Sequence, residues 1–488
     1  MKPKILLLNL PDPPGRVVNR GYAGGFGTAY NTKHSTDRPV FPVYLLYAAS
    51  ALEKSGCRYE ILDAQGMGYG IETVKKIIGD KKPDIILSWI SLPSFYHDIK
   101  CLNEAKSILG EDALVAGWGT TCKTLSRDIL QNSKIDLILN GEYPYYSTIL
   151  TFAKKIREKS DPKEIPGAVF LNDGKYFSNP PLNEDGDSLN RVLFEVYHKL
   201  PVHNYICTVG TYDGSKIEFL PIVTSAGCSY ACNYCPYPTG YGRKIKYKSI
   251  DKIIEEIKFL QHNFKINCFL FRDQNFLSNR ERVLNFCDKI IKENIKIKWF
   301  IEARTDLVSR ELLQKMKQAG CIRIHFGVES GSSKLANIAK PGSSLGKCMK
   351  AFKLCRELKI ATLAHMIVGL PGENRRTVEE TLSFLFKLRP DYINVNVLTP
   401  YPGTGLYEMA LKNNWISTFD WSKYTSYNVV MRTNELSVEE IEELKRYIER
   451  RWKIFKFIHN SGYKRILDKI IKILPSSHRR NNRTIINL

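Results

Sequence analysis

The sequence predicts an α/β protein made of two blocks of alternating strands and helices, followed by a helical tail. In the first block, five short apolar runs with the length of buried parallel strands alternate with segments of helical length. The second block has six such runs, and a helix-like segment follows each of the first five. The first pattern predicts an open doubly wound sheet in residues 1–150, and the second predicts a partial TIM-type (β/α)6 barrel in residues 216–425.

The first block is expected to form a Rossmann-like (flavodoxin-like) sheet, and such sheets bind ligands at the carboxyl ends of their strands. Its helices are expected at 43–55, 71–80, 96–109 and 122–132. Its strands are expected at Ile5–Leu10, Tyr59–Asp63, Asp84–Ile90, Ala113–Trp118 and Asp136–Asn140.

Residues 151–215 interrupt the alternation with several prolines and glycines, which predicts a linker or an irregular subdomain. In the barrel that follows, chemistry is expected at the C-terminal ends of the strands. These strands are expected at Glu218–Thr224, Cys268–Arg272, Lys296–Ile301, Arg323–Val328, Ala361–Val368 and Tyr392–Leu398.

The tail, residues 426–488, is expected to be helical. Ser437 and Glu440 have the spacing of a capping box in front of an apolar run. Further on, an apolar stripe at helical spacing has lysines and arginines beside it, and such a helix either lies on an anionic membrane or packs with its charged face in solvent. The stripe consists of Tyr463, Ile466, Leu467, Ile470, Ile471 and Leu474.

Composition narrows the function without deciding it. Hydrophobic residues make up 43% of the 488 residues, which is enough for sizeable cores. Subtracting 50 acidic from 72 basic residues gives a net charge of +22, which favours contact with an anionic partner. The twelve cysteines accompany no secretory signal, and no apolar run is long enough to span a membrane, so we expect a cytoplasmic protein.

The strongest motif is a group of three cysteines, Cys228, Cys232 and Cys235, at C-x3-C-x2-C spacing. Iron–sulfur clusters are usually held by four cysteines. Three thiolates therefore leave one iron of a 4Fe-4S cluster open for a substrate or cofactor, much as catalytic metal sites keep an open position. The alternative is a structural zinc site, which requires a fourth ligand at typical spacing. The nearest candidates are distant or wrongly spaced: Cys207, Cys268, His203 and His262.

This spacing, directly after the first barrel strand, resembles the radical S-adenosylmethionine (SAM) superfamily. The resemblance continues in order along about 200 residues, with one segment at the end of each later strand. The matching segments are Phe271–Phe276, Glu302–Asp306, Gly327–Gly331, Gly369–Glu373 and Thr399–Thr404.

The resemblance implies that the open iron chelates SAM, and that one electron from the cluster cleaves SAM to a 5′-deoxyadenosyl radical, which abstracts hydrogen from an unactivated carbon. It implies that Tyr234 packs near the adenine and that Arg304 and Glu329 hold polar groups of SAM. The alternatives for these two are an exposed ion pair and a carboxylate at a helix N-terminus. The glycine motif, with Gly369, Gly372 and Glu373, is implied to lie near the adenine.

The first block resembles the cobalamin-binding domain that precedes the barrel in one radical SAM subfamily. The matching segments are Pro11–Pro14, Pro42–Leu52, Ile61–Ala64, Gly117–Thr120 and Asn140–Glu142. The resemblance implies bound cobalamin, with a lower cobalt ligand that stays unassigned because there is no D-x-H-x-x-G motif. The alternative is a domain of this fold that has lost its cofactor. The implied contact residues are Gly117, Gly119, Thr120, Gly141 and Glu142.

The segment Arg20–Gly27 before Pro42 resembles the branch that contains anaerobic magnesium-protoporphyrin cyclase and enzymes of hopanoid or archaeal lipids. This implies cyclisation, rearrangement or C-methylation of a membrane lipid or other hydrophobic substrate. The implied partners are that small-molecule or lipid substrate, a reductant such as flavodoxin or ferredoxin, and a membrane surface touched peripherally.

Two alternatives belong to other functional classes. An RNA-modifying methylthiotransferase suits the positive charge, but such enzymes carry extra N-terminal cysteine ligands and a small C-terminal β domain. Here Cys57, Cys101 and Cys122 are scattered and the tail is helical in pattern, which argues against nucleic acid. A non-catalytic iron–sulfur or cobalamin-binding protein is the other alternative, and the full set of strand motifs argues against it.

Overall fold

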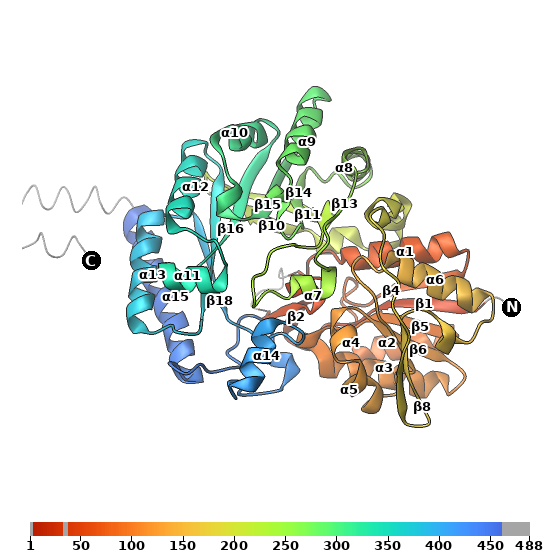
Figure 1. The fold of residues 1–488 in the computed structure, drawn as a ribbon. Coiled ribbons are helices and arrows are strands. Elements are labelled where there is room, and N and C mark those ends of the chain that lie inside the picture. Colours follow the sequence, from red (N-terminus) through yellow and green to blue (C-terminus); the bar gives the residue numbers. More distant parts are fainter. Residues whose placement is uncertain (1–2, 33–37, 461–488) are drawn as a thin grey trace, which may run out of the picture.

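The computed structural model describes residues 3–32 and 38–460. Figure 1 shows two α/β parts beside each other, the N-terminal one in red to yellow and the C-terminal one in green to blue. Helices flank both sheets, as expected when both faces of a mainly parallel sheet need covering. The predicted α/β class, with a Rossmann-like part before a partial barrel, is confirmed.

The N-terminal sheet has the strand order β4-β1-β5-β6-β7-β8-β9, and its first five strands are parallel. All five predicted strands are therefore present. The order changes direction at β1, and this switch point is where ligands of such sheets bind. The strands are β1 (Lys4–Asn9), β4 (Arg58–Asp63), β5 (Ile85–Trp89), β6 (Leu114–Trp118) and β7 (Leu137–Leu139).

The segment 151–215 adds an antiparallel hairpin, β8 (Ala168–Asn172) and β9 (Lys175–Ser178), to the edge of this sheet. The helix expected at 122–132 is wrong as one unit, because Leu125 has φ −117° and ψ 23° and separates two short helices. These are α4 (Thr120–Thr124) and α5 (Ser126–Gln131). The other helices are α1 (Val43–Ser55), α2 (Ile71–Lys81), α3 (Phe95–Leu109) and α6 (Tyr146–Arg157).

The second sheet has the order β10-β11-β14-β15-β16-β17-β18, in which β10 is antiparallel and the six following strands are parallel. These six are the predicted barrel strands. The strands are β10 (Cys207–Gly210), β11 (Lys216–Ile222), β14 (Cys268–Phe271), β15 (Lys298–Ala303), β16 (Cys321–Glu329), β17 (Ala361–Val368) and β18 (Tyr392–Val397).

The outer helices of the half-barrel begin at polar N-cap residues whose side chains accept a hydrogen bond from a backbone N–H of the first turn. The caps are Ser249, Asn279, Ser309, Ser344 and Asn374. Because each cap follows a loop from a strand end, the caps set where each strand gives way to its helix. The helices are α8 (Ile250–Phe264), α9 (Arg280–Lys292), α10 (Arg310–Gln318), α12 (Leu345–Glu357) and α13 (Arg375–Leu388).

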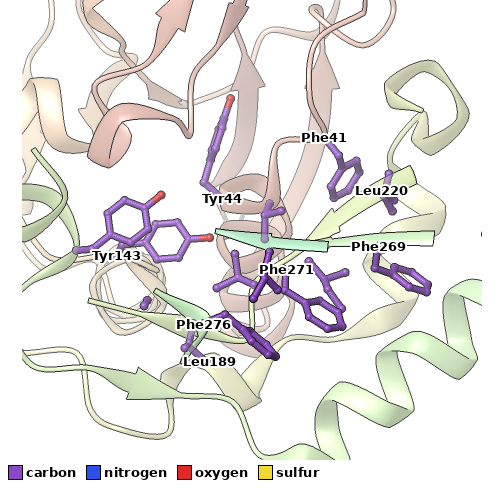
Figure 2. Packing of buried hydrophobic residues seen from close by; sticks show 14 of the residues in the cluster. Phe41, Tyr44, Tyr143, Leu189, Leu220, Phe269, Phe271 and Phe276 are labelled. Atoms are coloured by element: carbon purple, nitrogen blue, oxygen red, sulfur yellow. The ribbon is translucent and has the colours of Figure 1, made fainter. Parts of the chain in front are cut away.

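One continuous hydrophobic cluster joins the two sheets. Figure 2 shows Phe41 from the N-terminal part beside Leu220 of the barrel, in a cluster that also contains Tyr44, Phe269 and Phe271. All five are buried. Since full burial of such a side chain is worth about 1.5–3 kcal/mol, this shared core fixes the N-terminal sheet relative to the barrel.

A hairpin of β2 (Arg16–Asn19) and β3 (Thr28–Asn31) extends from the N-terminal part towards the barrel. Its tip contains Gly24, whose φ is +65° and whose missing Cβ would lie 2.4 Å from the backbone oxygen of Pro236. Pro236 directly follows Cys235. The hairpin tip thus touches the end of the cysteine loop.

We expect Gly24→Ala to weaken this contact by about 3 kcal/mol, because the methyl group meets backbone and the residue keeps a left-handed conformation. Gly15 is the matched control, since its φ is +70° and nothing lies within 4 Å of its missing Cβ. Urea unfolding of both variants checks this, and equal destabilisation of Gly15→Ala would contradict it.

The C-terminal part ends in α14 (Gly405–Lys412) and α15 (Val438–Asn460). The predicted capping box is present, because Ser437 N–H donates to Glu440 Oε2 over 2.7 Å and Glu440 N–H donates to Ser437 Oγ over 3.2 Å. The expected stripe at 463–474 lies outside the described residues. None of the helices within residues 3–32 and 38–460 is long and apolar enough to cross a bilayer.

Candidate functional site

A cavity of about 350 Å³ lies at the C-terminal ends of the barrel strands. The cysteine loop lines one side, and side chains of β15 to β18 line the other. Of the residues predicted for the cluster and SAM, six line this cavity: Cys228, Cys232, Cys235, Tyr234, Arg304 and Glu329.

The chain just before the cysteines is held by a buried carboxylate. Asp273, 1% exposed, accepts hydrogen bonds from the backbone N–H groups of Thr224 and Ser225, both over 2.8 Å. The hydroxyls of the same two residues donate to its other oxygen over 2.6 and 2.7 Å. The neighbouring Gln274 accepts from Gly227 N–H over 2.8 Å. The end of β14 therefore fixes the path of the chain into the cysteine loop.

The three cysteines are free, half-buried thiols around one cavity. Among residues 3–32 and 38–460, no three His, Cys, Asp or Glu side chains are grouped closely enough to hold a single metal ion. A cubane cluster takes its thiolates at separate corners, so three cysteines facing a shared cavity suit it as a donor set.

Arg304 reaches the cavity while an acidic neighbour holds its guanidinium. Its Nε and Nη2 donate to the two oxygens of Asp306, both over 2.9 Å, and its Cζ lies 4.0 Å from the centre of the Tyr230 ring. Arg304 is 6% exposed and Asp306 is half-buried, so the pair is not the exposed pair of the alternative. A guanidinium fixed in this way is preorganised to bind a carboxylate.

Glu329 sits at a bulge in the pairing of β16 with β17, with a φ of +68° and 5% exposure. Lys340 Nζ lies 3.7 Å from its carboxylate and donates to the Gly327 oxygen over 2.9 Å. Burial, with the negative charge of the Glu329 carboxylate adding to it, raises the pKa of Tyr234 well above its usual range. These groups form a polar wall beside the cysteines. Lys340 was not predictable from the sequence, because nothing in its spacing links it to Glu329.

The glycine motif after β17 does not line the cavity. Glu373 turns back into its own loop and accepts from Gly369 N–H over 2.6 Å, while Gly372 N–H donates to Glu435 over 3.1 Å. Ile441 of α15 packs against Gly369. This loop therefore supports α15 from behind the site. Burial raises the pKa of Glu373 to about 7.

We expect Glu373→Gln to flatten the pH dependence of stability. The unfolded carboxyl ionises near pH 4.5, whereas the folded one keeps its proton to about pH 7. Glu373 therefore stabilises the fold fully below pH 4.5, and this contribution declines to zero as the pH rises to about 7. The effect is at most about 3 kcal/mol.

Urea unfolding between about pH 5 and pH 8 measures it. The exposed Glu72→Gln is the control and should follow the unmodified protein. If the free energy of unfolding of Glu373→Gln changed with pH in parallel with that of the unmodified protein, the raised pKa of Glu373 would be refuted.

The five residues predicted to contact cobalamin lie at the C-terminal edge of the N-terminal sheet or close to it, in contact with protein groups. Thr120 Oγ1 donates to the Gly24 oxygen over 2.7 Å, and Glu142 lies 3.1 Å from Lys246 Nζ. A Cβ on the three glycines would meet side chains at 2.5–3.1 Å: Cys122 and Ile90 at Gly117, Trp89 at Gly119, and Thr148 at Gly141.

The same edge carries buried polar atoms that have no hydrogen-bond partner in the part of the chain that the structure describes. Buried polar groups are normally hydrogen-bonded, so these unpaired atoms are available to hydrogen-bond the polar groups of a ligand at this edge. The rings of Tyr44, Trp89, Trp118 and Tyr145 pack there with centroids 4.7–5.9 Å apart, so a ligand must part them to enter. The unpaired atoms are Trp89 Nε1, Trp118 Nε1, Thr121 Oγ1, Asn140 Oδ1, Tyr145 Oη and Thr148 Oγ1.

The comparisons with known proteins agree with this architecture. Residues 222–385 match the family model described as the radical SAM superfamily. An uncharacterized methyltransferase of Pyrococcus horikoshii is 27% identical over 409 residues, covering 83% of this chain and 86% of that protein. The anaerobic magnesium-protoporphyrin IX monomethyl ester cyclase of Cereibacter sphaeroides is 26% identical, covering 82% of this chain and 65% of the cyclase.

Among solved structures, the cobalamin-dependent S-adenosylmethionine radical enzyme OxsB, with aqua-cobalamin and S-adenosylmethionine bound, matches with a TM-score of 0.69. The two are 16% identical, and the match covers 100% of this chain and 71% of OxsB, which shows a shared fold. The chain therefore contains a radical SAM domain, whose family uses a 4Fe-4S cluster and SAM, and it is an enzyme. The non-catalytic alternative is not supported.

Proposed function

We propose that this enzyme forms a carbon–carbon bond at an unactivated carbon of a hydrophobic substrate, by C-methylation or ring closure, with cobalamin on its N-terminal domain. The observation that carries the proposal is the single cavity onto which the three cysteines, Arg304 and Glu329 converge at the barrel mouth. The methyltransferase and cyclase names of the relatives support both reaction types.

The protein groups have distinct tasks in this proposal. When bound, the 4Fe-4S cluster supplies the electron that cleaves SAM, and cobalamin supplies a methyl carrier. The three thiolates hold the cluster, Arg304 offers its guanidinium to the SAM carboxylate, and Glu329 accepts from the SAM ribose or amino group. Tyr234 and Lys340 keep Glu329 in place.

The hairpin tip and the segment after β18 border the cavity on the side of the N-terminal domain. Tyr22 and Thr28 come from the hairpin, and Tyr401 and Tyr427 come from the segment that follows β18. Thr28 Oγ1 donates to the Thr425 oxygen, which ties the two segments together. They exclude water from the place where a reactive species would form.

Deuterated-methyl SAM, hydroxocobalamin and a strong reductant test the proposal on anaerobically reconstituted protein. We expect about one equivalent of tightly bound cobalamin, with quenched tryptophan fluorescence because the rings of Trp89 and Trp118 must move. Deuterated methyl on cobalamin with S-adenosylhomocysteine indicates methyl transfer, and bound cobalamin without methyl transfer indicates ring closure. Protein that retains no cobalamin would refute the cobalamin part.

We also propose a peripheral membrane contact through the end of α15. Ile454 and Ile458 are 51% and 44% exposed, and Lys453, Lys456 and Arg450 lie on the same turns. Apolar and basic side chains together suit an anionic bilayer. Co-sedimentation with vesicles tests this. We expect the protein to sediment with phosphatidylglycerol vesicles and not with neutral phosphatidylcholine vesicles. The double variant Ile454→Glu with Ile458→Glu should lose this binding.

A further inference from the structure

Below the predicted SAM groups, the inside of the barrel carries a layer of polar side chains. We define this polar layer as Arg272, Glu302, His325, His365 and Asn394, which come from five neighbouring strands or their ends. Glu302 pairs in register with His325, and His365 pairs with Asn394. Four of the five line the cavity, and Arg272 lies behind Glu302.

Three residues of the polar layer lie two positions before other residues that line the cavity, nearer the N-terminal ends of their strands. Glu302 precedes Arg304, His325 precedes Gly327, and Asn394 precedes Asn396. The polar layer therefore forms the floor of the cavity, opposite the cysteines at the strand C-terminal ends. Below the floor the side chains become apolar, and Phe300 packs against His325 with ring centroids 5.5 Å apart.

The floor has hydrogen-bonding capacity that the protein does not use. His325 Nε2 is buried and has no partner among the described residues. His365 Nδ1 has only a long contact of 3.4 Å with Asn394 Nδ2, and the two histidine rings lie 5.8 Å apart. A barrel interior that served packing alone would gain nothing from such groups, since an unpaired buried polar atom costs about 1–3 kcal/mol.

The charges around the floor are already balanced. Arg272 Nη1 lies 3.0 Å from Glu302, its Nη2 donates to the Tyr237 hydroxyl over 3.0 Å, and its Cζ lies 3.6 Å from the centre of the Tyr22 ring. Higher in the cavity, the proposed function assigns Arg304 to the SAM carboxylate, and Lys340 is paired with Glu329. Burial lowers the pKa of both histidines, so they are neutral near pH 7.

We propose that the polar layer binds an uncharged hydrogen-bonding group of the substrate, such as a hydroxyl or carbonyl, through His325 and His365. The inference rests on the proposed function, because it takes this cavity as the substrate site. A carboxylate would face Glu302 without a free cation, and an ammonium would face Arg272. The bound oxygen anchors an otherwise hydrophobic substrate and sets which carbon lies towards the cysteines.

Binding of small probes tests this without turnover. Four cyclohexyl compounds share one ring and differ in one group: cyclohexanol, cyclohexanecarboxylate, cyclohexylammonium and methylcyclohexane. Ligand-observed NMR on reconstituted protein with oxidised cluster and SAM compares their affinities. We expect cyclohexanol to bind at least about tenfold more tightly than the other three.

Variants locate the effect. His325→Phe with His365→Leu should abolish the preference for cyclohexanol, whereas His325→Gln with His365→Asn should keep part of it, because the amides still hydrogen-bond. Equal binding of cyclohexanol and methylcyclohexane, preference for a charged probe, or an unchanged preference in the apolar variant would each overturn the inference.

The two proposals fail separately in this design. Cluster absorbance and reductive SAM cleavage, measured on the same samples, report the proposed function and do not need the floor. If the protein cleaves SAM but binds the four probes equally, only the substrate-binding role of the polar layer is wrong. A protein that prefers cyclohexanol but does not cleave SAM refutes the proposed function and leaves the binding site.

Discussion

Replacing Cys232 with alanine is expected to remove the iron–sulfur cluster. The three cysteines line one cavity, and no other cysteine of the described residues lines it. With two thiolates left, the cluster loses a corner that no other thiol lining this cavity replaces. We expect iron and sulfide content, and absorbance of the cluster, to fall below about one tenth of those of the unmodified protein.

Cys57→Ala is the matched control. Cys57 is also half-buried, and its Sγ contacts the Ala153 oxygen over 3.1 Å in the N-terminal domain. Its loss should leave cluster content unchanged. If Cys232→Ala folded normally and retained a full cluster, the cysteine motif would not be the cluster site.

Replacing Asp273 with asparagine is expected to lower the stability of the fold strongly. Asp273 accepts four hydrogen bonds from Thr224 and Ser225 in a site that is closed to solvent. An amide turns one acceptor oxygen into a donor, which then faces other donors. We expect a loss of about 3 kcal/mol in the free energy of unfolding.

The effect should reach the site, because this carboxylate holds the chain four residues before Cys228. We expect Asp273→Asn to lose its reconstituted cluster faster during gel filtration, and its urea unfolding midpoint to fall. Asp288→Asn, on the exposed side of α9, is the control and should change neither property. Normal stability with a normal cluster would show that the loop is held by other contacts.

The strands were predictable because each is a short apolar run between turn residues. This pattern is local and does not depend on which element packs beside the strand. The same holds for the cysteine spacing, which is local. The two histidines of the polar layer were missed for a physical reason. His325 and His365 lie in separate strands, and an inward-facing histidine in an apolar strand looks like any other polar interruption.

Side-chain direction was equally hard to foresee. Glu373 belongs to a motif that was expected near the adenine, yet its carboxylate folds back onto Gly369 N–H. Likewise, Gly119 was expected to contact cobalamin, but the Trp89 ring lies against it. Both outcomes depend on residues distant in the chain or on loop closure, which a linear pattern does not encode.

The most direct test of the central claim is the formation of 5′-deoxyadenosine from SAM by anaerobically reconstituted, chemically reduced protein. We expect the unmodified protein and Cys57→Ala to produce 5′-deoxyadenosine, and Cys232→Ala to produce none. A protein with an intact, reducible cluster that leaves SAM uncleaved would contradict the assignment of this cavity as a radical SAM site.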